Sequence, residues 1–141
     1  MKAIKILLPV LFAAFLFGTQ SCGKYEEGPA FSLRSKKARV VNHWKVDKYY
    51  YNGDETSLGD LKIYYYFEDD NTGKIKHTFG SATSEDEFTW DFNDDKTSII
   101  VKFKDGGEYE YTILKLYEKE MWLRYTKDDP KEEHEYHLIP E

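Results

Sequence analysis

The chain has 141 residues, among them twelve tyrosines, which is enough for one domain of ordinary size and too aromatic for a disordered chain. Lys2 and Lys5 lie in the first 21 residues, so residues 22–141 carry 18 basic and 26 acidic side chains, a formal charge of −8. This charge excludes nucleic acid as a partner and argues against binding of the protein surface to anionic lipid.

Residues 1–21 have the layout of a secretory signal peptide. Two lysines precede an apolar run over residues 6–17, and small or polar residues come just before Cys22. The run is too short for a membrane-spanning helix, which needs roughly 20 apolar residues. Residues 18–23, Gly-Thr-Gln-Ser-Cys-Gly, resemble a bacterial lipobox, in which the cysteine becomes the lipid-carrying first residue of the mature protein.

Cys22 is therefore predicted to carry palmitate and to anchor the protein in the outer membrane, facing either the periplasm or the cell surface. It is the only cysteine, and an unpaired thiol would be a liability in an oxidising compartment. The alternative is an ordinary signal peptide that leaves one cysteine behind. Residues 22–34 contain two glycines and a proline, which predict a flexible tether.

Residues 35–141 are predicted to form one all-β domain after a short helical turn. Ser35 is placed to cap a turn over residues 36–41, with Val40 and Val41 toward the core and the basic side chains toward water. Turn signals such as Asn52-Gly53 separate about eight strand-like segments, and residues 80–86 predict a loop. The predicted strands are 43–51, 62–68, 74–79, 87–92, 97–104, 108–117, 121–127 and 132–139.

Apolar and polar residues alternate within these segments, as in Phe88-Thr89-Trp90-Asp91. Such alternation predicts strands with one buried face and one solvated face. Sequential strands with one apolar face remove their exposed edges by closing on themselves. We therefore predict an antiparallel up-and-down barrel of about eight strands, with a two-sheet sandwich as the alternative.

Residues 40–46, Val-Val-Asn-His-Trp-Lys-Val, resemble the Gly-x-Trp motif of lipocalin-like barrels, with Asn42 where glycine is usual. Residues 88–96 and 109–116 resemble the middle strands of small lipocalin-like lipoproteins of Bacteroidetes-type bacteria. The resemblance implies that Trp44 plugs the closed end of the barrel and that Arg124 packs across it. It also implies a small apolar or amphipathic ligand at the open end.

The candidate ligand-binding residues near the open end are Tyr50, Tyr65, Phe79 and Tyr111. We expect a shallow pocket rather than a deep one, because eight-stranded barrels are just wide enough for side chains to fill. The sequence has no nucleophile motif and no phosphate-binding loop, so we predict a protein that is not an enzyme and needs no cofactor.

Two tyrosine-rich segments support an alternative function as an envelope interaction module with a solid core. Alternate residues of a strand face outward, so Tyr49, Tyr51, Tyr64 and Tyr66 are predicted to form an exposed band for a protein or glycan partner. The structural explanation is that tyrosine stabilises sheets through cross-strand pairs.

No metal site is predicted. His134 and His137 are three residues apart, which places them on opposite faces of one strand. Residues 69–73 offer oxygen ligands but lack the twelve-residue calcium-binding loop with its terminal glutamate.

Overall fold

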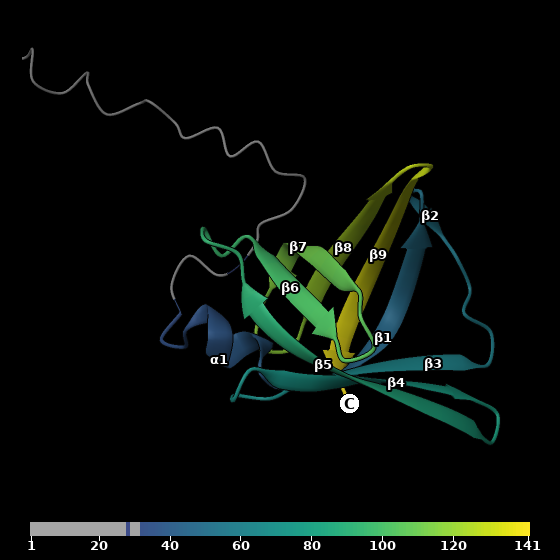
Figure 1. Cartoon of the computed structure of the whole chain (residues 1–141), viewed down its shortest axis with the longest axis horizontal. Coiled ribbons are helices and arrows are strands. Elements are labelled where there is room, and N and C mark those ends of the chain that lie inside the picture. The colour runs from purple at the N-terminus through teal and green to yellow at the C-terminus, as the bar shows by residue number, and fades with distance from the viewer. Residues whose placement is uncertain (1–27, 29–31) are drawn as a thin grey trace, which may run out of the picture.

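A computed structural model describes Gly28 and residues 32–141. These residues form a closed, eight-stranded antiparallel barrel with one short helix on its N-terminal side, which confirms the predicted all-β fold (Figure 1). The predicted signal peptide, Cys22 and most of the predicted tether lie outside the described residues. In the described part of the chain, no helix is long and apolar enough to cross a membrane.

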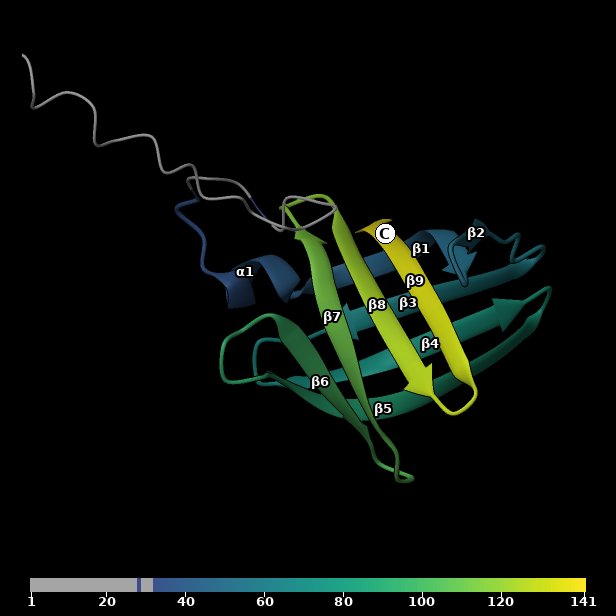
Figure 2. The ribbon, with the colours of Figure 1, turned by 90° about the horizontal axis from the view of Figure 1, so that it is seen from above.

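β1 pairs with β3, each strand from β3 to β8 pairs with the next one along the chain, and β1 also pairs with β9 to close the barrel (Figure 2). β2 has two residues that pair with the end of β1, so the other eight strands make the closed wall. The elements are α1 (Lys36–Val40), β1 (Asn42–Tyr51), β2 (Asp54–Glu55), β3 (Leu61–Phe67), β4 (Thr72–Phe79), β5 (Ala82–Phe92), β6 (Ser98–Phe103), β7 (Glu108–Leu116), β8 (Met121–Asp128) and β9 (Lys131–Pro140).

The two ends of the barrel differ. α1 lies at one end, which we call the closed end, together with the β3–β4, β5–β6 and β7–β8 turns. The β4–β5 and β8–β9 hairpins project away from α1, and with the β6–β7 turn they surround what we call the open end (Figures 1 and 2). The Asn52-Gly53 turn after β1 also lies there, and positive φ angles of 50° and 89° explain this residue pair.

The start of α1 agrees with the prediction from the sequence, whereas one of its basic side chains is buried instead of exposed. Ser35 caps the helix by accepting a hydrogen bond of 3.1 Å from the backbone N–H of Ala38. Arg39 was expected to face water, yet it is only 9 % exposed. Its Nη1 donates a 2.8 Å hydrogen bond to the carbonyl oxygen of Leu116 at the end of β7. This tertiary contact, which joins α1 to the β7–β8 turn, overrides the expected exposure.

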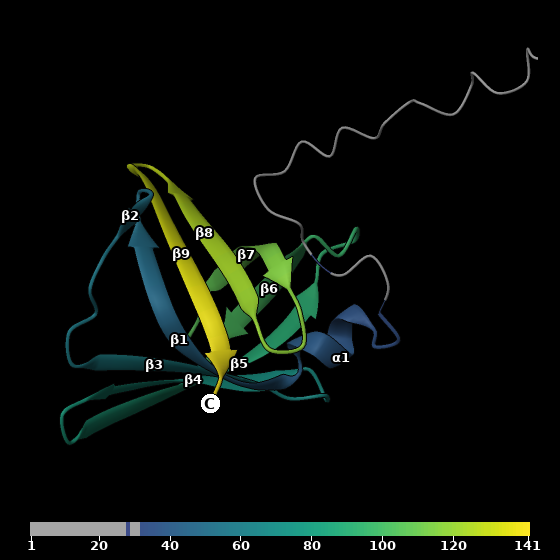
Figure 3. The ribbon, with the colours of Figure 1, turned by 180° about the vertical axis from the view of Figure 1, so that it is seen from behind.

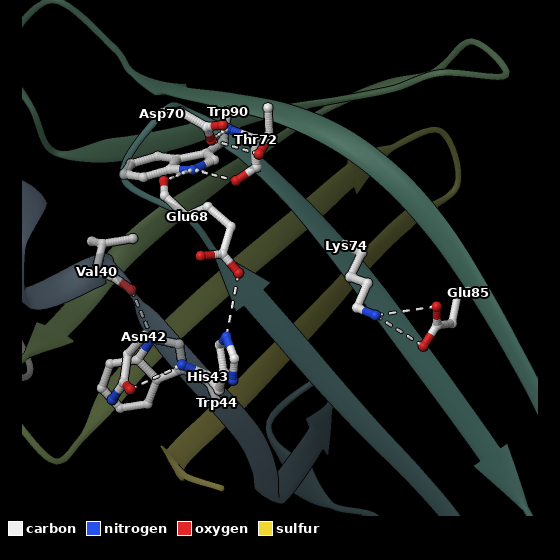
Figure 4. A network of polar contacts seen from close by, with 10 residues as sticks. All are labelled: Val40, Asn42, His43, Trp44, Glu68, Asp70, Thr72, Lys74, Glu85 and Trp90. Atoms are coloured by element: carbon white, nitrogen blue, oxygen red, sulfur yellow. Dashed lines mark hydrogen bonds and ion pairs between the residues drawn. The ribbon is translucent and has the colours of Figure 1, made fainter.

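Two indole rings hold the closed end together (Figure 4). Trp44 is fully buried, and its Nε1–H donates a 2.8 Å hydrogen bond to the carbonyl oxygen of Val40 in α1. The Nε1–H of Trp90 donates to the carbonyl oxygens of Glu68 and Thr72, at 3.2 and 3.1 Å, on either side of the β3–β4 turn. Each buried N–H therefore has an acceptor, as buried polar groups require.

Inward side chains from all the barrel strands form the core, in agreement with the predicted alternation. Packing of these side chains removes a large apolar area from water, which is the main stabilising contribution to such a fold. The buried cluster comprises Val40, Trp44, Val46, Ile63, Tyr65, Phe67, Ile75, Phe88, Trp90, Ile99, Val101, Tyr111, Ile113, Leu116, Met121, Leu123 and Leu138.

A β-bulge between Val46 and Lys48 reverses the alternation in β1. Tyr49 after the bulge points inward, where its ring centroid lies 5.3 Å from that of Tyr136 on β9. Tyr50 points outward, and its ring centroid lies 4.8 Å from that of His137 on β9. The prediction that Tyr49 faces outward and that Tyr50 lies among the ligand-binding residues inside the open end is therefore wrong. The extra residue of a bulge moves every later side chain to the other face.

The β4–β5 hairpin is longer than predicted. Residues 80–86 were expected to form a loop, but β5 begins at Ala82 and only Gly80 and Ser81 form the turn. A φ of +59° at Gly80 suits this two-residue turn. The polar residues that follow pair with β4 along its whole length, because the ladder of backbone hydrogen bonds outweighs their low strand propensity. The extension carries Asp86 into the wall of the open end.

Candidate functional site

The open end of the barrel contains a cavity of about 360 Å³. Small-ligand pockets typically have volumes of about 300–1,000 Å³, so this cavity suits a small molecule. Six strands, whose arrangement in the barrel is seen from behind in Figure 3, and the β6–β7 turn contribute residues to its wall. The lining residues are Ile63, Tyr65, Ile75, His77, Asp86, Glu87, Phe103, Lys104, Asp105, Gly106, Tyr109, Tyr111 and Tyr136.

Three tyrosines that we call the tyrosine triad, Tyr65, Tyr111 and Tyr136, line the buried side of the cavity. They come from β3, β7 and β9, and their ring centroids are 6.4, 6.2 and 6.3 Å apart. The ring planes cross at 78°, 65° and 65°, so each pair meets edge to face. Tyr65 is 3 % and Tyr111 is 7 % exposed. The triad is therefore a packed aromatic surface with hydroxyl groups at the base of the cavity.

Burial keeps the hydroxyls of the tyrosine triad protonated. Desolvation raises the pKa of Tyr111 to about 12 and also raises the pKa values of Tyr65 and Tyr136. A hydrogen-bond interaction between the Tyr65 and Tyr111 hydroxyls also affects the two pKa values.

Alkaline titration is expected to separate the triad from exposed tyrosines. Because the folded pKa of Tyr111 lies above its unfolded value of about 10, its contribution to stability is complete below pH 10 and is lost as the pH rises toward 12. Phenolate absorbance should show these tyrosines ionising late and together with unfolding. Tyr111→Phe should reduce the loss of stability above pH 10. An unchanged pH dependence in this variant would contradict the assignment.

Acidic side chains lie at the mouth of the cavity. Asp86 faces inward beside its cross-strand partner Ile75, and Asp105 lies in the β6–β7 turn. Glu87 and Lys104 form an ion pair with each other. Within the described residues neither Asp86 nor Asp105 has an ion-pair partner. The mouth therefore has an excess of negative charge.

Two of the four predicted ligand-binding residues line this cavity. Tyr65 and Tyr111 belong to the tyrosine triad. Tyr50 points outward because of the β1 bulge, and Phe79 lies at the end of β4 with 62 % of its surface exposed. The structure thus separates the four residues that the sequence had grouped.

Several lining residues were missed. Tyr136, Tyr109 and Phe103 lie on the inward faces of their strands, near the open end. Their alternation and their distance from the turns were visible in the sequence, and combining the two signals selects them. Asp86 was hidden because its segment was expected to be a loop.

The four tyrosines predicted to form one outer band lie on two different faces. Tyr49 points into the barrel, where its hydroxyl lies 2.7 Å from Nδ1 of His134, and Tyr51 follows the same phase. Tyr64 and Tyr66 point outward, with ring centroids 6.5 Å apart. The prediction of a common band is therefore wrong, and the β1 bulge is the reason. The interaction-module alternative retains only the outward pair on β3.

Lysine side chains cover this outward pair. The Lys76 Nζ lies 4.5 Å from the centroid of the Tyr64 ring and 5.3 Å from that of Tyr66. Lys74 lies 5.1 Å from the Tyr66 ring and also pairs with Glu85 (Figure 4). The His43 ring also packs on Tyr66, with a centroid distance of 4.6 Å, and only 7 % of Tyr66 is exposed. Lysine stems often cover apolar surface in this way while the ammonium group stays in water.

Arg124 lies on the outer surface of β8 and not beside Trp44. Its Nη2 donates a 2.8 Å hydrogen bond to Glu135, and its Nε lies 3.4 Å from a carboxylate oxygen of Glu133, both on β9. The role of Arg124 at the closed end, implied by the resemblance, is therefore wrong. The buried arginine at that end is Arg39, which comes from α1 and not from a late strand.

The histidines of β9 point to opposite faces. His134 lies inside near Tyr49, and His137 stacks outside on Trp122 with a centroid distance of 3.8 Å and an interplanar angle of 2°. Across the part of the chain that the structure describes, no three His, Cys, Asp or Glu side chains are grouped to hold a metal ion.

A family model described as a lipocalin-like domain matches residues 40–123, more than half of the chain. No curated protein and no solved structure gives a significant match. The matched residues include Trp44 and two members of the tyrosine triad, whereas Tyr136 lies beyond them. Lipocalin-like domains are generally non-enzymatic binding domains. With its closed barrel and this match, the chain belongs to the lipocalin-like domain family.

Proposed function

We propose that this protein is a lipid-anchored, non-enzymatic envelope lipoprotein whose barrel binds a small amphipathic ligand in the open-end cavity. The observation that carries the proposal is a cavity of about 360 Å³ at the mouth of a lipocalin-like barrel, based on the tyrosine triad. The depth of the cavity is limited because the triad and the core fill the rest of the interior.

The lining favours a ligand that is apolar on one side and polar on another. Ile63, Ile75 and Phe103 provide apolar walls, and burial of a ligand against them gains roughly 25 cal/mol per Å² of apolar area. The tyrosine triad also lines the cavity, and tyrosine hydroxyls can donate or accept a hydrogen bond with a polar group of the ligand.

Binding of a neutral bicyclic probe tests this proposal. We expect 2-(2-naphthyl)ethanol to bind saturably to the full chain, followed by naphthalene fluorescence. Ile75→Trp fills the cavity and should abolish binding. Ile139→Trp adds the same side chain on the outer face of β9 and should leave binding intact. If the probe does not bind, or binds equally to both variants, the cavity is not a ligand site.

Lipid anchoring at Cys22 is the second element of the proposal. It is supported by the lipobox-like sequence and by the formal charge of −8 on residues 22–141, which disfavours direct adhesion to anionic lipid. Mass spectrometry of the membrane fraction should detect an acylated peptide that begins at Cys22. Cys22→Ala should release the protein from membranes. An unmodified mature chain that begins after Cys22 would disprove the anchor.

The anchored domain is proposed to lie on the outer membrane, facing the periplasm or the cell surface. Protease treatment of intact cells separates the two orientations. Loss of the barrel domain from intact cells indicates the surface, and protection until the outer membrane is permeabilised indicates the periplasm.

A further inference from the structure

The charge distribution at the mouth of the cavity distinguishes among small amphipathic ligands. Of the four ionised side chains in its lining, Glu87 and Lys104 neutralise each other as an ion pair. Asp86 and Asp105 carry no counter-charge within the described residues. Both carboxylates border the same cavity: Asp86 lies on β5, which pairs with one side of β6, and Asp105 lies in the turn that follows β6. A carboxylate ligand entering here would face repulsion from both.

The interior of the cavity also favours a cation over an anion. The ring faces of neutral tyrosines carry negative electrostatic potential, which attracts cations. Tyr109 stands above the triad, with its ring centroid 5.7 Å from that of Phe103 at an angle of 86°. A ligand body is therefore surrounded by aromatic rings and aliphatic side chains, with the carboxylates at the exit to water.

We propose that the ligand is an organic cation, with an aromatic or apolar body on the tyrosine triad and a protonated amine at the Asp86 carboxylate. This inference rests on the proposed function of the cavity. Asp86 is the better placed of the two acids because it projects inward from a strand, next to Ile75. Strands hold a charged group more firmly than turns do. Asp105 adds long-range attraction from the β6–β7 turn. The same arrangement disfavours fatty acids and other anions.

Three probes with one shared body test the sign of the charge. The measurements are made at about pH 7.5, where histidine side chains, with an ordinary pKa of about 6.5, are mostly neutral. At this pH 2-(2-naphthyl)ethylamine is a cation, 2-(2-naphthyl)ethanol is neutral and 2-naphthylacetate is an anion. We expect the amine to bind about fivefold to tenfold more tightly than the alcohol, and the acetate most weakly. Added salt should narrow the differences, because the carboxylates are exposed.

Asp86→Asn removes the charge while it keeps the shape of the side chain. It should weaken binding of the amine about fivefold to tenfold and leave the alcohol unchanged. Asp94→Asn is the matched control, because Asp94 is an exposed aspartate in the β5–β6 turn at the closed end. The control should affect none of the probes, and far-ultraviolet circular dichroism of both variants should match that of the parent.

The outcomes separate this inference from the proposed function. If the alcohol binds as tightly as the amine, if the acetate binds best, or if Asp86→Asn leaves the amine affinity unchanged, the cationic ligand is disproved and the cavity remains a binding site. If none of the three probes binds, the proposed function fails and this inference fails with it. Tighter binding of the amine that is lost in Asp86→Asn alone supports both.

Discussion

Replacing Trp44 by alanine is expected to lower the free energy of unfolding by about 3–5 kcal/mol. The side chain is fully buried at the closed end, so the substitution leaves a large cavity. It also removes the 2.8 Å hydrogen bond to the carbonyl oxygen of Val40 and with it one of the links to α1. Small domains are stable by about 5–15 kcal/mol, so this is a large fraction of the total. Urea unfolding monitored by far-ultraviolet circular dichroism measures the effect.

Trp122→Ala is the matched control for Trp44→Ala. Trp122 lies on the outer face of β8, half-buried and stacked on His137, so its removal leaves no internal cavity. We expect a clearly smaller loss of stability. Trp44→Phe should fall between wild type and Trp44→Ala, because it keeps an aromatic ring but loses the N–H donor. Equal destabilisation by Trp44→Ala and Trp122→Ala would show that Trp44 is not central to the closed end.

Gly73→Ala is expected to destabilise the barrel by about 1–3 kcal/mol, although it adds a single methyl group. A Cβ at this position would overlap the ring of Phe88 and the carbonyl oxygen of Tyr66. The backbone of β4 therefore approaches its neighbours β3 and β5 too closely for any side chain here. Gly73 does not have a positive φ angle, so the cause is space and not backbone conformation. The midpoint of urea unfolding measures the loss.

A second substitution tests this explanation. Phe88→Leu shortens the side chain that Cβ would overlap, and Gly73→Ala should cost less in its presence than alone. The rescue should be partial, because the Tyr66 carbonyl belongs to the backbone and has little freedom to move. A Gly73→Ala loss within about 0.5 kcal/mol of zero, the usual range for neutral surface changes, would contradict the close approach.

Most of the fold was predictable because strand alternation is a local property. The run Phe88-Thr89-Trp90-Asp91 alternates without interruption, and its predicted buried face agrees with the structure. Alternation on one face of sequential strands leaves few architectures other than a closed meander. The capping serine before α1 is a short-range signal of the same kind.

The candidate site was less predictable because it depends on which residues meet across the barrel. Tyr136 joins Tyr65 and Tyr111 only when β9 has closed against β1. A bulge has no clear sequence signature, so strict alternation placed Tyr49 and Tyr50 on the wrong faces. Asp86 was assigned to a loop on composition, and its pairing with β4 was a long-range property of the sheet.

The sequence by itself determined the number of barrel strands, most of the turn positions and the acidic charge, because each depends on composition or on residues close together in the chain. Only the tertiary structure decided that the interior is filled at one end and open at the other. It also placed the Asp86 carboxylate in the wall of the same cavity as the tyrosine triad, through the register of β4 against β5 and the closure of β9 on β1. Register and closure are set by the sum of contacts along whole strands, and no single motif encodes that sum.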